Sequence, residues 1–279
     1  MSKLLYNALQ TSSLKQVIND LRKVCKKLNI DFFAIGALAR NIWYVSNEKE
    51  ARGTRDVDFA VYISDEESYQ SLKKELIENY KYTQTTSNAF CLISPHNVEL
   101  DLLPFGEIEN DDRVKIEGKG LTTLNLDGFL ETYKFGLKEF EIENEKLKIC
   151  SLPAIVLLKL ISFDDRPEER IKDAKDINSI LLHYPNMETD LIWDEYNFLY
   201  DNEKSHQQVG IETLGYEIAK IIVQDEKLTK RVTNILKKAI LKQSRLSIQM
   251  IENSIKETIE DKINLLKYLE FEIIEGIKN

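Results

Sequence analysis

Cysteine and histidine are scarce in this sequence, and their scarcity argues against two kinds of site. Each type occurs three times among the 279 residues. The cysteines are odd in number, far apart and without metal-ligand spacing, so we expect reduced thiols in a cytoplasmic protein. No two histidines lie at ligand spacing, which argues against a zinc site. These residues are Cys25, Cys91, Cys150, His96, His183 and His206.

Long apolar runs and a surplus of positive charge are also missing. No apolar run has the length needed to span a bilayer, and residues 1–7 lack the apolar core of a signal peptide. The chain has 38 Lys and Arg against 47 Asp and Glu, a net charge of −9. This balance argues against a broad, indiscriminate nucleic-acid surface. The length fits one large domain or two small ones.

One segment concentrates positive charge despite the acidic total. Seven basic residues fall between positions 227 and 245. They form either the solvated face of an amphipathic helix or a surface that contacts a phosphate backbone, and the sequence leaves both interpretations open. The residues are Lys227, Lys230, Arg231, Lys237, Lys238, Lys242 and Arg245.

Hydrophobic periodicity divides the chain near residue 150. Alternating strand and helix patterns predict an α+β domain with a mixed sheet over residues 1–150. From there on, Gly and Pro are sparse and Leu or Ile recurs every three or four residues, which predicts an all-helical domain over residues 151–279. Expected helices cover 12–28, 36–45, 66–79 and 126–135, expected strands cover 31–35, 55–63, 90–94, 98–103, 137–142 and 146–150, and 246–274 forms one long helix or two.

Two aspartates on the expected strand 55–63 are the most informative feature of the chain. Asp56 and Asp58 fall on the face opposite Val57, Phe59 and Val61, because side chains alternate along a strand. Carboxylates at i and i+2 point the same way, roughly 6–7 Å apart, and repel each other unless a cation lies between them. A hard, oxygen-preferring ion such as Mg²⁺ is the natural occupant.

A third acid follows on the expected strand 98–103. Glu99 and Asp101 alternate with Val98, Leu100 and Leu102, so they share one face. If this strand lies near 55–63, Asp101 joins the aspartate pair; otherwise it is a strand-end residue bonded to the backbone. Three carboxylates on neighbouring strands can hold two metal ions, which activate a hydroxyl and stabilise a leaving phosphate.

Gly36-Ala37 lies between an expected strand and an expected helix. Backbone N–H groups at a helix start attract phosphate, and glycine allows that phosphate to approach closely. The dipeptide precedes the aspartate pair by about twenty residues, which makes a phosphate site near the carboxylates a reasonable expectation.

A lysine and two further aspartates are candidates in the helical half. Lys159 lies in a strongly apolar helix, where it either extends to solvent or points at an anion. Asp173 and Asp176 share one helix face. They form either a surface ion-pair network with Arg170 and Lys172 or a fixed carboxylate that orients Lys159 or an arginine toward a substrate.

In this order the motifs resemble the nucleotidyltransferase superfamily with the DNA polymerase β-like palm. Within it the chain is most similar to the AbiEii/AbiGii-type family, the toxins of abortive-infection and type IV toxin–antitoxin systems. The matching part covers about residues 33–180. It contains Gly36-Ala37, Arg52-x-Thr54-x-Asp56-Val57-Asp58, Glu99 to Gly106, Lys159 and Arg170-x-Lys172-Asp173-x-x-Asp176-Ile177.

The resemblance implies a role for each matching residue. Asp56, Asp58 and Asp101 match the metal-binding carboxylates, which hold Mg²⁺, two ions in such palms, and Asp101 matches the ligand on the side of the acceptor hydroxyl. Gly36 matches the glycine that contacts the nucleotide phosphates. The superfamily usually has serine where this chain has Ala37, so one hydroxyl that could bond a phosphate oxygen is absent and efficiency is in doubt.

Further matches concern the nucleotide. Lys159 matches a lysine expected on the triphosphate. Asp173 or Asp176 matches the downstream aspartate, with Asp173 as the first choice. The residues that lead into the acid strand, and that we group with the nucleotide-binding set, are Arg52 and Thr54.

The activity that the resemblance implies is Mg²⁺-dependent transfer of a nucleoside monophosphate from an NTP to a hydroxyl, with release of pyrophosphate. It suggests a tRNA 3′ end as acceptor and an antitoxin protein as partner. The lack of a long apolar run predicts that no membrane is involved. Alternative acceptors are a protein Ser, Thr or Tyr hydroxyl, or a small molecule such as an aminoglycoside. A nucleotide-binding or partner-binding module with slow or absent turnover is the non-enzyme alternative, and Ala37 is its best support.

Overall fold

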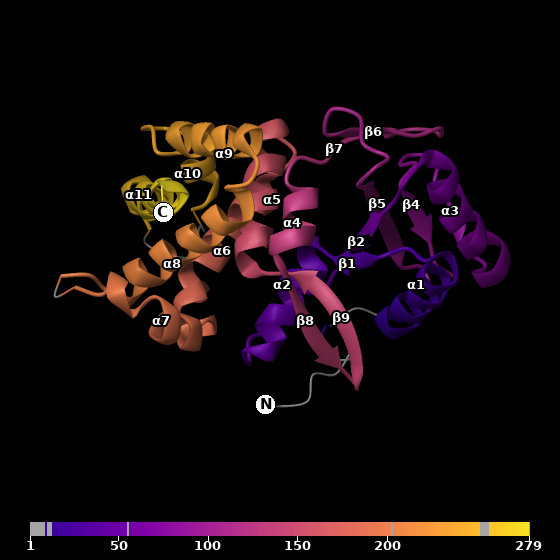
Figure 1. Cartoon of the computed structure of the whole chain (residues 1–279), viewed down its shortest axis with the longest axis horizontal. Coiled ribbons are helices and arrows are strands. Elements are labelled where there is room, and N and C mark those ends of the chain that lie inside the picture. Colours follow the sequence, from indigo (N-terminus) through magenta and orange to yellow (C-terminus); the bar gives the residue numbers. More distant parts are fainter. Residues whose placement is uncertain (1–8, 10–12, 55, 202, 252–256, 279) are drawn as a thin grey trace. The chain divides into compact units, whose positions relative to one another are not determined.

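The computed structural model of the protein describes residue 9 and residues 13–54, 56–201, 203–251 and 257–278. Contacts divide the chain into two units, whose elements are labelled in Figure 1. The first unit consists of Met1–Leu130 and Leu137–Ser151, and the second of Glu131–Gly136 and Leu152–Asn279. Strands lie in the first unit and helices in both, so the predicted α+β class is confirmed.

A mixed seven-stranded sheet forms the centre of the first unit, with strand order β3-β4-β5-β2-β1-β9-β8. Two neighbouring pairs, β2 with β5 and β1 with β9, are parallel, and the other pairs are antiparallel. The strands are β1 (Phe32–Ala34), β2 (Asp56–Tyr62), β3 (Thr83–Gln84), β4 (Cys91–Ile93), β5 (Glu99–Phe105), β8 (Leu137–Ile142) and β9 (Glu145–Cys150).

The alternation predicted for the acid strands is present in β2 and β5. Val57 and Phe59 of β2 are fully buried, as are Leu100 and Leu102 of β5. The apolar side chains of the two central strands therefore lie in the core, and burying them stabilises each by about 1.5–3 kcal/mol. The acidic side chains are left on the opposite face.

Three short strands are additions to the predicted set. They are β3, β6 (Arg113–Lys115) and β7 (Thr123–Asn125), and β6 and β7 form a separate two-stranded sheet. Each has only two or three residues, too few to show a period of two. Backbone bonds secure the β6–β7 hairpin instead, since Leu121 exchanges hydrogen bonds with Ser87 and Ala89.

Helices of the first unit begin and end close to their predicted positions. The carboxylate of Asp65 caps α3 by accepting a hydrogen bond from Ser68 N at 2.7 Å, as expected for an N-cap aspartate. Residue 12, where the first helix was expected to start, lies outside the described residues. The helices are α1 (Leu14–Leu28), α2 (Gly36–Ser46) and α3 (Glu66–Tyr80), followed by α4 (Phe129–Phe135), whose last residues belong to the second unit.

The second unit is built around α5 (Leu152–Asp165), which packs against α6, α8 and α9. Its side chains are buried on nearly every side, as expected for a helix that is apolar all round. The segment 246–274 contains parts of two helices rather than one, with residues 252–256 outside the described part. The remaining elements are α6 (Ile171–Met187), α7 (Thr189–Glu195), η2 (Asn197–Leu199), α8 (His206–Ile222), α9 (Glu226–Ala239), α10 (Arg245–Gln249) and α11 (Ile259–Lys278).

Within the described ranges, every helix is too short or too polar to cross a membrane.

Candidate active site

Strand register places two of the predicted carboxylates side by side. Asp58 of β2 lies directly opposite Asp101 of the parallel strand β5, and Asp56 lies opposite Glu99. Neighbouring strands are about 4.8 Å apart, so Asp58 and Asp101 lie next to each other on one face. Asp58 and Asp101 are half-buried, while Asp56 is exposed and accepts a hydrogen bond from the Thr54 hydroxyl.

Gly36 is held against this carboxylate face. Ile35 N donates to the Asp58 carbonyl oxygen at 3.0 Å, which fixes the start of α2 beside β2. Gly36 has a φ of +60°, and a Cβ on it would come within 2.6 Å of Asp58 Oδ2. The backbone conformation favours glycine here, and any larger residue would also have to displace the Asp58 carboxylate. The N-cap residue Ile35 has an apolar side chain, so it cannot cap the N–H groups of the first turn.

Three more residues predicted near the nucleotide lie close to this face: Ala37 in α2, and Arg52 and Thr54 just before β2. Ala37 is half-buried in the first turn of α2. The Asn41 side chain, further along α2, donates to the carbonyl oxygen of Arg52 at 2.7 Å. The Arg52 side chain is exposed, and Thr54 follows it toward β2. Helix α2 therefore holds the segment that leads into the aspartate pair.

Asp101 lies in the middle of β5 and has polar neighbours that sequence reasoning missed. Asn88 Nδ2 donates to Asp101 Oδ1 at 3.3 Å, and Cys91 faces Asp101 across the β4–β5 pair. Burial, followed by the Asp101 charge, raises the pKa of the Cys91 thiol and the Tyr69 hydroxyl above their usual values. Both groups therefore remain protonated beside the carboxylate at neutral pH.

The donor chemistry at this face fits Mg²⁺, because carboxylate oxygens are its preferred protein ligands. The register of Asp58 with Asp101, and the position of Asp56 on the same face of β2, agree with that chemistry. In the part of the chain that the structure describes, no three Asp, Glu, His or Cys side chains are grouped closely enough to hold an ion as they stand. The Asp56 carboxylate instead accepts a hydrogen bond from the Thr54 hydroxyl.

Lys159 is buried in the second unit between the two downstream aspartates. Its Nζ lies 2.6 Å from Asp173 Oδ1 and 2.9 Å from Asp176 Oδ2, and all three residues are at most 9% exposed. Burial lowers the pKa of Lys159, but the two carboxylates outweigh burial and the net pKa is raised. Lys159 therefore does not extend to solvent, and the aspartates are not part of a surface network, although Arg170 lies 3.9 Å from Asp173.

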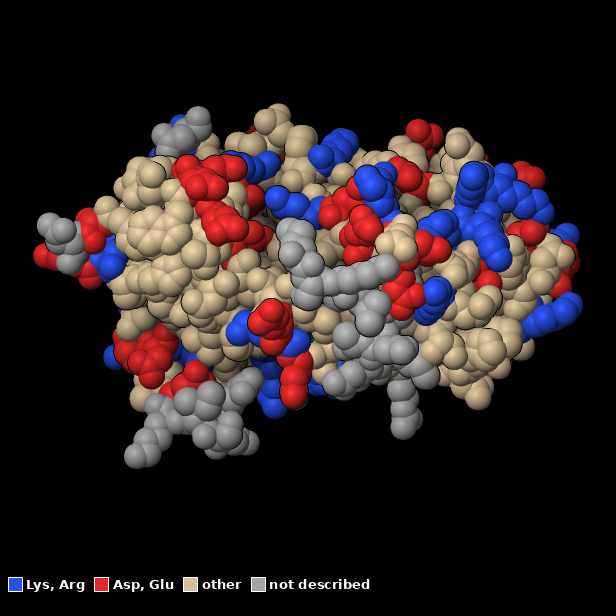
Figure 2. Space-filling model, turned by 90° about the horizontal axis from the view of Figure 1, so that it is seen from below, with Lys and Arg blue, Asp and Glu red and all other residues tan. Residues whose placement is uncertain are grey.

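The basic segment of α9 and α10 forms ion pairs within its own unit. Three of its seven residues pair with acids at the end of α5 or just after it: Arg231 with Asp165, Lys238 with Asp164 and Arg245 with Glu168. In the first unit, Figure 2 shows Lys and Arg gathered over α1 and α3 among scattered Asp and Glu. The pairing on α9 favours the solvated-face interpretation of the segment.

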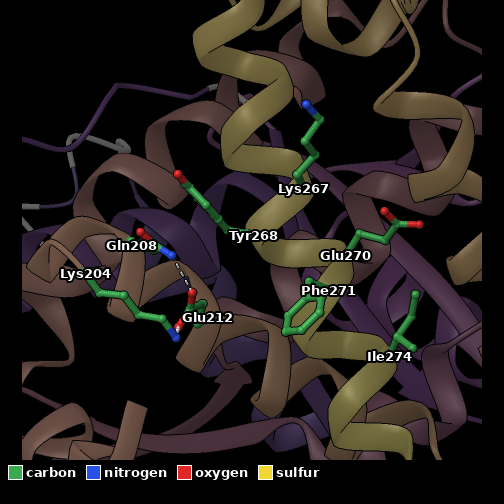
Figure 3. Close-up of a pocket in the computed structure, with 8 residues that line it drawn as sticks. All are labelled: Lys204, Gln208, Glu212, Lys267, Tyr268, Glu270, Phe271 and Ile274. Atoms are coloured by element: carbon green, nitrogen blue, oxygen red, sulfur yellow. Dashed lines mark hydrogen bonds and ion pairs between the residues drawn. The ribbon is translucent and has the colours of Figure 1, made fainter. Parts of the chain in front are cut away.

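A cavity of about 610 Å³ lies between α8 and α11 in the second unit (Figure 3). An ion pair of Lys204 with Glu212 at 2.8 Å, and a hydrogen bond from Gln208 to Glu212 at 2.8 Å, line one side. Tyr268 and Phe271 of α11 line the other. The candidate residues named above are absent from its lining.

Comparisons with known proteins find several similar solved structures, two of which follow, while no family model and no curated protein matches this chain. One is an antigenic nucleotidyltransferase-like protein from Paracoccidioides brasiliensis, 17% identical, with 71% of this chain and 93% of that chain covered and a TM-score of 0.40. The other is the antibiotic-resistance factor ANT(2'')-Ia, 14% identical, with 66% and 93% covered and a TM-score of 0.39. Likeness at this level does not transfer an activity or a substrate.

Proposed function

We propose that this chain is a Mg²⁺-dependent nucleotidyltransferase that moves a nucleoside monophosphate from an NTP to a hydroxyl and releases pyrophosphate. The observation that carries the proposal is the pairing of Asp58 with Asp101 directly beside the glycine start of α2. Carboxylates on one side and N–H groups of a helix start on the other suit a metal-bound triphosphate.

Each of the candidate residues at the carboxylate face has a proposed role. Asp56, Asp58 and Asp101 hold Mg²⁺, with Asp101 on the side of the acceptor hydroxyl. Mg²⁺, when bound, lowers the pKa of a hydroxyl nucleophile and neutralises charge on the phosphates. Gly36 allows a phosphate to approach the first turn of α2, where Ala37 contributes its backbone N–H.

The remaining nucleotide contacts are proposals of the same kind. The motif resemblance supports Lys159 as the triphosphate lysine, oriented by Asp173. Its Nζ is ion-paired with both Asp173 and Asp176, so a phosphate contact requires one of these ion pairs to open. A lysine held by two carboxylates has a fixed position, which supports an orienting role for the pair. Arg52 and Thr54 lie next to the acid strand and complete the proposed nucleotide-binding set.

The motif resemblance supports a tRNA 3′ end as acceptor, a role as the toxin of an abortive-infection or type IV toxin–antitoxin system, and a cytoplasmic location. The ion pairs of the α9 segment argue against an RNA-backbone contact there, because they neutralise part of its positive charge. A protein hydroxyl and a small-molecule hydroxyl remain the alternative acceptors, and an antitoxin protein remains the proposed partner.

The test uses NTPs labelled at the α or the γ phosphate, with Mg²⁺ and with tRNA and protein fractions side by side. Transfer predicts α-label in a product and γ-label released with pyrophosphate. Loss of labelled product after RNase treatment identifies an RNA acceptor, and loss after protease treatment a protein acceptor. Thermal stabilisation by an NTP without any labelled product would instead indicate a binding module.

A further inference from the structure

We propose that Asn88 is a positioning residue of the carboxylate face, whose side-chain amide fixes the orientation of Asp101. The inference rests on the proposed function and adds to it a residue outside all of the motifs. Asn88 Nδ2 donates to Asp101 Oδ1 at 3.3 Å, across the turn that precedes β4. Partners that hydrogen-bond a metal-binding carboxylate orient it and sharpen its affinity for the ion.

The direction of this hydrogen bond follows from the other end of the same amide. Phe90 N donates to Asn88 Oδ1 at 3.0 Å. A backbone N–H can only donate, so the oxygen of the amide must face Phe90 and the NH₂ group must face Asp101. Asn88 can therefore donate to the ionised carboxylate of Asp101, and a hydrogen bond to a charged group is stronger than one between neutral groups.

The backbone that carries Asn88 is fixed from both sides. Ala89 N donates to the Leu121 carbonyl and Leu121 N to the Ser87 carbonyl, each at 2.9 Å. This approach requires Gly120, because a Cβ there would come within 2.0 Å of the Ser87 oxygen. These bonds hold the residues on both sides of Asn88, so the loop is a rigid support for its side chain.

A buried lysine secures the same loop from the core. Lys73 of α3 is 2% exposed and donates through Nζ to the Ala89 carbonyl at 2.8 Å. Burial lowers the pKa of Lys73, because it disfavours the charged ammonium. The hydrogen bond to Ala89 and the nearby Tyr69 ring stabilise the ammonium in this buried position. An amide supported in this way can hold a carboxylate in one orientation.

The decisive variant is Asn88→Asp, compared with Asn88→Ala and with Asn97→Asp as control. Asn88→Asp keeps an oxygen that accepts from Phe90 N, but it replaces the donor to Asp101 with a second carboxylate that repels it. We expect kcat for labelled transfer to fall about tenfold or more in both Asn88 variants. Asn97→Asp makes the same charge change in the exposed β4–β5 turn and should leave kcat unchanged.

A titration with Mn²⁺ as probe separates this inference from the proposed function. We expect Asn88→Ala to weaken Mn²⁺ binding about tenfold. Weakened binding with no transfer by the wild-type protein would refute the proposed function and support the inference. Wild-type kcat in Asn88→Asp, or an equal loss in Asn97→Asp, would overturn the inference alone. A wild-type protein that neither transfers label nor binds Mn²⁺ would overturn both.

Discussion

At the scale of single residues, Gly36 connects backbone geometry to the carboxylate face. It occupies a left-handed conformation and lies against Asp58, so a side chain there would displace the carboxylate as well as strain the backbone. Asp58 and Gly36 were predicted from alternation and from a strand–helix turn. Asn88 could not be predicted in this way, because its contact with Asp101 depends on how β4 registers with β5.

Gly36→Ala separates strain from displacement when it is compared with Gly128→Ala. Both glycines have positive φ, 60° and 84°, so each alanine should cost about 1 kcal/mol in unfolding free energy. Only Gly36→Ala pushes on Asp58, and we expect its transfer rate to fall about a hundredfold, the effect of a displacement of about 1 Å. Steady-state kinetics and urea unfolding measure the two effects. Equal rates for the two variants would contradict the proposed role of Gly36.

Lys159 is the second residue with a sharp expectation. Lys159→Met leaves Asp173 and Asp176 buried together without their cation, so we expect a loss of about 3 kcal/mol or more in unfolding free energy. Lys172→Met removes an exposed lysine from the same helix as the two aspartates and should change stability by less than about 0.5 kcal/mol. Chemical denaturation followed by circular dichroism tests the difference. Similar stabilities for the two variants would show that the buried cluster contributes little.

At the scale of elements, period and burial determined which segments could be predicted. Strands β2 and β5 have one apolar face, and α5 is apolar on all sides, so the pattern of their side chains predicts these elements. The β6–β7 hairpin and the loop before β4 are held by backbone hydrogen bonds to each other. Such contacts leave no pattern in the side chains, which is why the support for Asp101 was missed.

The α8–α11 pair predicts a pH-dependent stability. The helices approach closely at Gly215, where a Cβ would lie 3.0 Å from Glu272 Cβ. Burial and the charge of Glu212 raise the pKa of Glu272, and Tyr216 and Lys204 oppose this only in part. The folded state therefore binds the Glu272 proton more tightly than the unfolded state. The resulting stability is present below the unfolded pKa and is lost as pH rises through the folded pKa.

Glu272→Gln removes that dependence. We expect the variant to melt at a higher temperature than the wild-type protein at pH 7, with the difference shrinking as the pH approaches 4, because wild-type Glu272 is then protonated. Melting curves by differential scanning calorimetry between pH 4 and pH 8 provide the measurement. Glu270→Gln is a useful comparison on the same helix, because burial raises its pKa while Lys237 opposes the rise. A gap between wild type and Glu272→Gln that grows on acidification would show the opposite sign.

At the scale of the whole molecule, the acidic total and the distribution of ion pairs bear on the acceptor. The chain carries a net charge of −9, and the α9 segment neutralises part of its own charge against Asp164, Asp165 and Glu168. The charge balance therefore argues against a broad basic surface that would bind nucleic acid without selectivity.

The most direct test compares transfer of α-labelled NTP by the wild-type protein, Asp58→Asn and Asp31→Asn, with Mg²⁺ and mixed tRNA and protein acceptors. Asp31→Asn is the control, because it removes an exposed carboxylate that pairs with Lys148 on the surface. We expect wild type and Asp31→Asn to transfer label equally, and Asp58→Asn to be slower by at least about a hundredfold. Transfer by Asp58→Asn at the wild-type rate, or no transfer by the wild-type protein to any acceptor, would contradict the proposed function.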